Sequence, residues 1–258
     1  MPLRDLRITK GHALFIDGVL IPVEELINHR SIFWDDRAQE VQIYHIELET
    51  HDVLIANGVP AESYRDDGNR WLFRNANSGW HLAPQEPCAP LLTGGPVVDA
   101  IWRRLLDRAG PRPGVPLTDD PDLHLLVDGQ RVDGKAQAGG IYVFRLPRRP
   151  SSVRVISRAG SPDELGIARD PRLLGVALRQ AVVWRGPQMR LIEASDPALG
   201  HGFHQFEETN GLRWTDGDAL LSATLFDGID GACDVELDVG CTTRYPLFAT
   251  ERSIAVAA

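Results

Sequence analysis

The chain has 258 residues, of which 43% are hydrophobic and 24% are charged, as is typical of a soluble globular protein of one large or two small domains. The formal net charge of −9 excludes a general nucleic-acid binder, because contacts with phosphates need a basic face. No stretch approaches the ~20 apolar residues of a membrane span, so we expect no membrane-spanning segment.

The cysteine content predicts neither a disulfide framework nor a thiolate metal site. The three cysteines, Cys88, Cys233 and Cys241, are an odd number in a long chain, and no two have the C-x-x-C spacing. The N-terminus has no apolar run of signal-peptide length. We therefore expect a cytoplasmic protein without a cofactor, and export by a signal-independent route remains open.

Residues 13–22 predict a hairpin followed by a helical turn. The apolar runs at 13–16 and 19–21 flank Asp17 and Gly18, a pair that suits a two-residue hairpin turn. Pro22 favours the start of a short helix, because proline fits the first helical position. The first part of the chain is therefore expected to be rich in β-structure.

Residues 41–63 contain a second set of strand and turn signals. Residues 41–49 are predicted to form one half-buried strand that breaks near His51, and residues 53–56 form an apolar run before Asn57 and Gly58. Together with the hairpin, these segments predict a small β-domain over residues 1–79.

Two groups of polar residues are candidates for a single site in this domain. Thr9 and His12 lie at the start of a predicted strand, and His45 and His51 lie in and after the strand of residues 41–49. Imidazoles are the side chains that proteins use most often for general acid–base catalysis.

Collinear sequence blocks in this region resemble the Hedgehog/intein (Hint) autoprocessing fold. They are T-x-x-H at 9–12, DGVLIPVEELIN at 17–28, YHIELETHDVLIANG at 44–58 and PAESYRDDGNR at 60–70. The resemblance covers roughly residues 4–73 and is closest to bacterial Hint-type proteins outside the true inteins.

The resemblance implies roles for the four candidate residues. Hint domains begin with a cysteine or serine whose side chain attacks the preceding carbonyl in an acyl shift. By this resemblance His12 polarises or protonates the scissile amide and Thr9 helps to position it. His51 is the histidine near the C-terminal end of the site, and His45 stands where many inteins have an aspartate.

The departures from the family pattern predict an inactive chain. Glu62 and Ser63 replace the terminal His-Asn pair of inteins, and serine has no side-chain amide that cyclises, so splicing is not expected. The residues before Thr9 include neither cysteine nor serine, and the first cysteine is Cys88. We therefore expect a truncated or degenerate Hint module that is not an enzyme by itself.

Two alternatives for the histidines remain open at this stage. They are either structural histidines bonded to backbone carbonyls or, with Asp52, ligands of a metal in a small-molecule enzyme.

Residues 80–122 are predicted to join two domains through one helix. The apolar stripe at Val98, Ile101, Trp102, Leu105 and Leu106 has helical spacing between Pro96 and Gly110. Residues 110–122 have the Pro- and Gly-rich composition of a linker.

Residues 123–258 are predicted to form a β-sandwich or jelly roll, because short apolar runs alternate with turn signals and no long helix intervenes. The strand candidates are residues 123–127, 141–144, 153–157, 175–178, 181–184, 189–192, 220–225 and 235–239.

A cluster of polar and aromatic residues in this second domain predicts a binding loop. An exposed Trp214 beside carboxylates would suit glycan or protein recognition, with a ring for stacking; alternatively, Trp214 fills one end of the sandwich. A metal site at His201, His204 and Glu207 is a further alternative. The expected ligand-binding residues are His204, Glu207, Trp214, Asp216 and Asp218.

Overall fold

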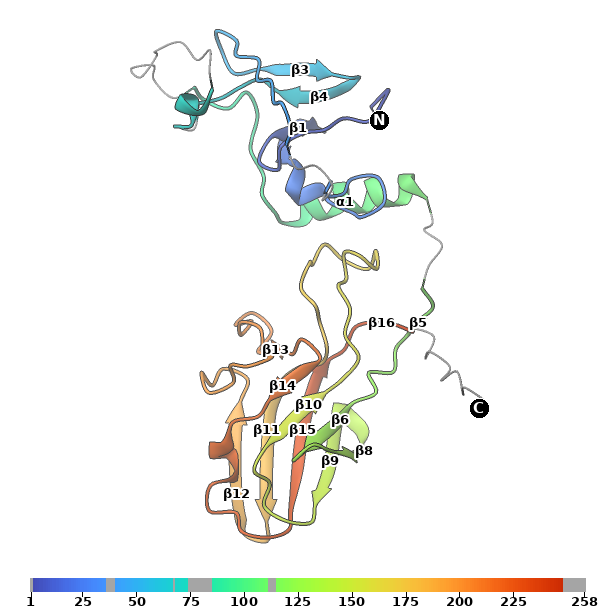
Figure 1. The fold of residues 1–258 in the computed structure, drawn as a ribbon, viewed down its shortest axis with the longest axis vertical. Helices are drawn as coiled ribbons and strands as arrows, with labels where there is room; N and C mark the ends of the chain where they lie inside the picture. Colours follow the sequence, from blue (N-terminus) through green and yellow to red (C-terminus); the bar gives the residue numbers. More distant parts are fainter. Residues whose placement is uncertain (1, 36–39, 67, 74–84, 111–114, 248–258) are drawn as a thin grey trace, which may run out of the picture. The chain divides into compact units, whose positions relative to one another are not determined.

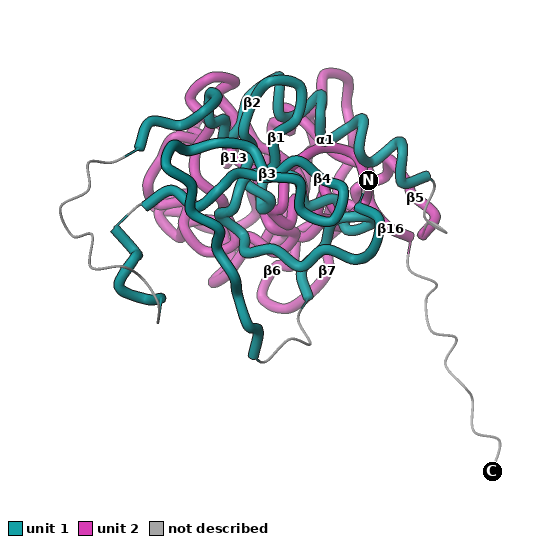
Figure 2. Tube along the Cα trace, turned by 90° about the horizontal axis from the view of Figure 1, so that it is seen from above, with its two compact units in different colours: residues 1–112 teal, residues 113–258 magenta. Residues whose placement is uncertain are grey.

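The computed structural model describes residues 2–35, 40–66, 68–73, 85–110 and 115–247. The chain divides into two compact units, residues 1–112 and 113–258 (Figure 1 and Figure 2). Among the described residues there is one α-helix, and the named strands pair in antiparallel sheets, which confirms the prediction of a mainly β protein. No helix in these ranges is long and apolar enough to cross a membrane.

The first unit is built on a four-stranded sheet in the order β2-β1-β4-β3. Its elements are β1 (Ala13–Ile16), β2 (Val19–Pro22), η1 (Val23–Leu26), β3 (Val53–Ala56), β4 (Val59–Glu62), η2 (Arg70–Leu72) and α1 (Pro96–Ala109). The sheet consists of two hairpins, β1-β2 and β3-β4, that meet where Leu14 pairs with Ala61.

Both hairpins close through a turn with two residues at positive φ. Asp17 and Gly18 have φ of 52° and 85°, and Asn57 and Gly58 have φ of 52° and 84°. Asn-Gly and Asp-Gly pairs tolerate this conformation, which matches the twist of the flanking strands. The predicted hairpin of residues 13–22 is confirmed, and the short helix after Pro22 is the 3-10 turn η1.

Helix α1 packs against the first unit through its apolar face. Val98 and Ile101 are buried in one cluster with Ile21 and Leu26. The buried indole Nε1–H of Trp102 donates a hydrogen bond of 2.6 Å to the carbonyl oxygen of Ile27. Proline at the first helical position and Gly110 at the end match the sequence signals for this helix.

The strand predicted for residues 41–49 is not formed, and this expectation is wrong. The segment has no regular secondary structure and belongs to no sheet of the described structure, and Val41 and Tyr44 are 47% and 79% exposed. An alternating apolar pattern gives a strand only where a neighbouring strand offers hydrogen bonds and a face to cover.

The second unit contains two main antiparallel sheets, ordered β14-β10-β6-β7 and β12-β11-β15-β9-β8, with β13 also paired to β11 and a short pair β16-β5 (Figure 1). Its strands are β5 (Leu117–Thr118), β6 (His124–Val127), β7 (Gln130–Asp133), β8 (Lys135–Ala136), β9 (Ile141–Leu146), β10 (Val153–Ile156), β11 (Ala177–Arg185), β12 (Gln188–Glu193), β13 (Arg213–Trp214), β14 (Asp218–Leu220), β15 (Cys233–Cys241) and β16 (Tyr245–Pro246). The short 3-10 turns are η3 (Ala138–Gly140) and η4 (Ala223–Phe226).

One core lies between these two sheets, as in a β-sandwich. Leu125 and Val155 from the smaller sheet are buried in the same cluster as Phe144, Val183 and Leu237 from the larger one. The alternating buried and half-buried pattern of β15 is what a strand with one face on a core requires.

Two of the strand predictions in this unit need correction. Residues 177–185 form one bulged strand instead of two separate ones. The strand predicted for 220–225 ends at Leu220, because Ser222 accepts a hydrogen bond from the backbone N–H of Thr224 and caps the 3-10 turn η4.

Candidate functional site

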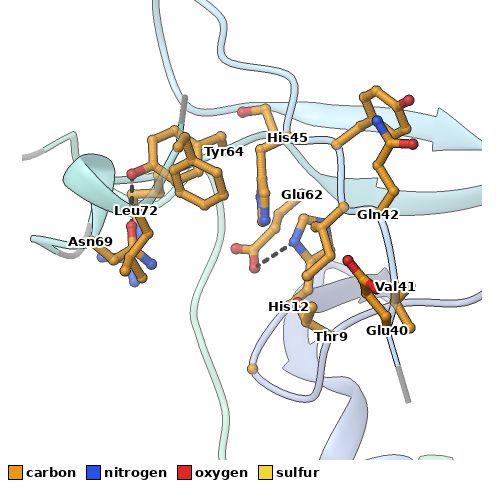
Figure 3. Close-up of a pocket in the computed structure, with 16 residues that line it drawn as sticks. Thr9, His12, Glu40, Val41, Gln42, His45, Glu62, Tyr64, Asn69 and Leu72 are labelled. Atoms are coloured by element: carbon orange, nitrogen blue, oxygen red, sulfur yellow. Dashed lines mark hydrogen bonds and ion pairs between the residues drawn. The ribbon is translucent and has the colours of Figure 1, made fainter. Parts of the chain in front are cut away.

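The first unit contains an open cavity of about 1200 Å³ beside the junction of the two hairpins. Thr9, His12, His45 and Glu62 line it, and Figure 3 shows His12, His45 and Glu62 pointing toward one another. The structure therefore brings both halves of the predicted site to one place, although they are more than thirty residues apart in the chain.

Glu62 lies at the centre of this site. Its Oε1 accepts a hydrogen bond of 2.6 Å from the backbone N–H of Ala13 and lies 3.9 Å from Nδ1 of His12. Its Oε2 lies 3.3 Å from Nε2 of His51. The pairing of Leu14 with Ala61 explains this placement, since it brings the end of β4 beside the start of β1.

His51 is held on the inner side of Glu62 in a defined tautomer. Its side chain is fully buried, and its Nδ1 accepts a hydrogen bond of 2.9 Å from the backbone N–H of Cys88. A nitrogen that accepts this bond carries no proton, so the ring proton of the neutral imidazole is on Nε2, which faces Glu62.

A pair of hydrogen bonds fixes the backbone next to His51. The N–H of Ser63 donates to the carbonyl oxygen of Asp52 at 2.7 Å, and the N–H of Asp52 donates to Oγ of the buried Ser63 at 3.0 Å. Ser63 therefore stabilises the backbone next to the site histidine.

His45, in the segment of residues 41–49, lines another side of the site. Its ring centroid lies 5.7 Å from that of His12 and 4.8 Å from that of Phe73. Burial and the neighbouring His12 lower the pKa of His45, and the charge of Glu62 opposes them. The buried Nδ1 of His45 has no hydrogen-bond partner among the described residues.

Tyr64 supports the wall behind His45. Its hydroxyl donates a hydrogen bond of 2.7 Å to Oδ1 of Asn69 (Figure 3), and burial, with the adjacent Asp66, raises the pKa of Tyr64 to about 12. Arg70 forms ion pairs with Asp66 and Glu47 and lowers the pKa of both carboxyl groups. The tyrosine therefore stays neutral and is a structural element of the site.

Thr9 lies at the rim of the cavity. Its carbonyl oxygen accepts the backbone N–H of His12 at 3.1 Å, and this turn places the His12 ring on the cavity wall. Its exposed side chain is available for contact with an incoming group.

Sequence reasoning missed Glu62 as a member of the site. The residue was considered only as a departure from the intein ending. The signal that identifies it is the pairing of β1 with β4, which a single sequence does not give because that pairing joins residues far apart in the chain.

A metal centre receives no support from this geometry. Within the described ranges, no group of three or more His, Cys, Asp or Glu side chains is arranged to hold a metal ion. This holds for the histidines of the first unit and for His201, His204 and Glu207 of the second.

In the second unit, Trp214 is buried and does not offer a ring for stacking. It is 8% exposed and packs with Leu174, Ala177 and Leu212. The expectation of an exposed tryptophan is therefore wrong, and Trp214 fills a small core beside β11.

The polar residues predicted around Trp214 have partners within the fold. His204 Nε2–H donates to the carbonyl oxygen of Leu173 at 2.7 Å, and Glu207 pairs with Arg172 at 2.8 Å. Asp216 Oδ1 accepts the backbone N–H of Asp218 at 2.9 Å, and Asp218 pairs with Arg154 at 2.6 Å. These contacts stabilise the loop.

Comparison with known proteins finds a family match for residues 1–68 of the first unit. Residues 1–68 match the family model of the Hint domain, so this part of the chain is a Hint-type domain, as its sequence blocks predicted. No curated protein and no solved structure matches the chain.

Proposed function

We propose that the Hint-type domain of residues 1–68 is an autoprocessing module whose acid–base centre consists of His12, Glu62 and His51. The observation that carries this proposal is the position of the Glu62 carboxylate, 3.9 Å from one imidazole and 3.3 Å from the other, on the wall of an open cavity. Two imidazoles on one carboxylate form an arrangement that moves a proton between a nucleophile and a leaving amine.

The reaction in this proposal is an acyl shift. A thiol or hydroxyl attacks the carbonyl carbon of the preceding peptide bond, a C–S or C–O bond forms, and the C–N bond breaks. The proton leaves the nucleophile and reaches the departing amide nitrogen through His12, so the step needs no co-reactant. The charge of the Glu62 carboxylate, which lies beside both rings, holds the two imidazoles in place, and the hydroxyl of Thr9 positions the scissile peptide.

The nucleophile of this reaction comes from a separate polypeptide segment. Residues 1–8 contain neither cysteine nor serine, and Ser63 is committed to the backbone of Asp52. Cys88 is an unsuitable nucleophile, because burial, Asp52 and Glu62 raise the pKa of its thiol. We therefore expect the 258-residue chain to stay intact on incubation with dithiothreitol or hydroxylamine.

The test supplies the nucleophile in trans. The chain is mixed with a polypeptide that carries a reporter followed by the cysteine-bearing first half of a Hint domain, and the complex is isolated by gel filtration. Dithiothreitol-dependent release of the reporter, measured by mass spectrometry, is the expected result. His12→Ala should reduce the release rate at least about 100-fold, as general acid–base groups do.

The matched control is His201→Ala, because His201 is an exposed histidine of the second unit. This variant should release the reporter at the wild-type rate. A complex that forms but releases no reporter, or equal rates for the two histidine variants, contradicts the proposal.

A further inference from the structure

Residues 41–48 have the side-chain pattern of a strand, and no strand in the part of the chain that the structure describes pairs with them. Val41 and Ile43 are 47% and 48% exposed, and Tyr44, Ile46 and Leu48 on the alternate positions are 79%, 59% and 36% exposed. Exposed apolar side chains on both faces of a strand-like segment are a costly arrangement in water, which a partner relieves.

The backbone of this segment is also largely unpaired. The carbonyl oxygen of Ile46 accepts the N–H of Tyr64 at 2.7 Å, and that of Leu48 accepts the Gln85 side chain at 3.2 Å. No backbone hydrogen bond to another described residue involves residues 41–45. Among the described residues, the backbone N–H and C=O groups of residues 41–45 therefore have no backbone partner and can pair with an added strand.

We infer that residues 41–45 are a docking edge for an extended strand of a separate polypeptide. The inference rests on the proposed function, because the same residues form one wall of the cavity that contains His12 and Glu62. A strand paired along this edge enters the site beside His45 and completes its open side. Main-chain hydrogen bonds supply the affinity, and apolar side chains at alternate positions supply the fit.

The charges at the ends of the segment indicate the chemistry of the partner. Glu40 precedes it and Glu49 follows it, and no lysine or arginine lies between them. In the antiparallel pairing that aligns residues 41–48 of two copies, Glu40 stands opposite Glu49, and like charges in directly opposed positions are destabilising. A second copy is therefore a poor partner, and a strand with basic residues at its ends is a good one.

The experiment uses the full chain and a synthetic probe. The probe is the capped peptide Lys-Val-Thr-Val-Thr-Val-Thr-Val-Thr-Lys, whose two lysines are as far apart in sequence as Glu40 and Glu49. The readout is the hydrogen-exchange protection of the amides of residues 41–45. We expect protection to increase at least about tenfold at alternate amides of this segment. A peptide of the same sequence with N-methyl groups on alternate amides keeps the side chains but loses one hydrogen-bonding edge, and it should give no protection.

Two further arms make the inference specific. The peptide with glutamate in place of both lysines should bind at least about tenfold more weakly. Ile43→Pro removes a backbone donor at an exposed position and should abolish protection by the lysine peptide, with the exchange of the β1–β4 sheet unchanged.

Several results overturn the inference. They are the absence of protection, equal protection by the N-methylated peptide, and protection that rises with protein concentration without any peptide, which would show that a second copy occupies the edge. This experiment measures peptide binding and not cleavage. A negative result here therefore does not bear on the reporter-release test of His12.

Discussion

Glu62 and His51 face each other across 3.3 Å, with the carboxylate at the end of β4 and the imidazole fully buried just before β3. The same His51 ring accepts a hydrogen bond from the backbone of Cys88 on its other nitrogen. This relationship ties three segments of the first unit to one side chain and places Nε2 of His51 beside the Glu62 carboxylate.

The tautomer of His51 is the first testable consequence. At pH 8, nitrogen NMR of the chain should show His51 with a protonated Nε2 and an unprotonated Nδ1, because Nδ1 accepts the N–H of Cys88. A protonated Nδ1 in the neutral ring would contradict the described hydrogen bond. The exposed His201 is the internal reference for an unconstrained ring.

The stability of the first unit should fall in acid partly because of His45. Burial and His12 hold the pKa of His45 below its usual value of 6.5. A histidine with a lowered folded-state pKa binds more protons when unfolded, so its contribution is complete above about pH 6.5 and is lost as the pH falls toward the folded-state pKa.

The measurement compares urea unfolding of wild type and His45→Phe at pH 8 and pH 5. The variant should show a smaller loss of unfolding free energy between these pH values, since it removes the titrating group and keeps a ring against Tyr64 and Phe73. An unchanged loss would show that His45 does not titrate with folding. His201→Phe should behave like wild type.

Helix α1 should depend on the hydrogen bond from Trp102 to Ile27. Trp102→Phe keeps an aromatic ring but leaves the buried Ile27 carbonyl without its donor, which costs about 1–3 kcal/mol of unfolding free energy. Trp34→Phe is the matched control, because Trp34 is 49% exposed, and it should change stability by less than about 0.5 kcal/mol. Equal effects of the two substitutions would show that the bond is unimportant.

Trp214 should be needed for the stability of the second unit. Trp214→Ala removes a buried ring that packs with Leu174 and Leu212 and should cost about 3–5 kcal/mol. Met189→Ala is the control, since Met189 is 65% exposed on β12. Hydrogen exchange of the second unit during urea unfolding measures the stability of both variants. A Trp214→Ala variant as stable as wild type would contradict the packing role.

The sequence predicted features whose signals are local. The Asp17-Gly18 hairpin and the helix that begins at Pro96 depend on turn chemistry and periodicity within a few residues, and both are present. The Hint resemblance was likewise visible in contiguous blocks, and the family match at residues 1–68 confirms it.

The errors concern features that depend on distant partners. Residues 41–49 have the alternation of a strand, but a strand forms only where another segment pairs with it, and no described segment does so. Trp214 in a loop rich in aspartate and glutamate resembles a binding residue. Its burial depends on distant residues: Ala177, which pairs with it where β13 meets β11, and Leu174, which packs in the same cluster.

The role of Glu62 in the site also could not be predicted from the sequence. Its role depends on the pairing of Leu14 with Ala61, which brings the start of β1 beside the end of β4. The Hint resemblance of the sequence blocks pointed to His12 and His51, but the carboxylate between them required the three-dimensional arrangement.

The most direct test of the central claim compares Glu62→Gln with Glu25→Gln in the reporter-release reaction with the cysteine-bearing polypeptide. Glu25 lies in η1 and does not line the cavity, so Glu25→Gln controls for the loss of one negative charge. The account predicts wild-type release for Glu25→Gln and at least a tenfold slower release for Glu62→Gln, about 1.4 kcal/mol of added barrier. Equal release by the two variants would contradict the claim that Glu62 joins His12 and His51 into one acid–base centre.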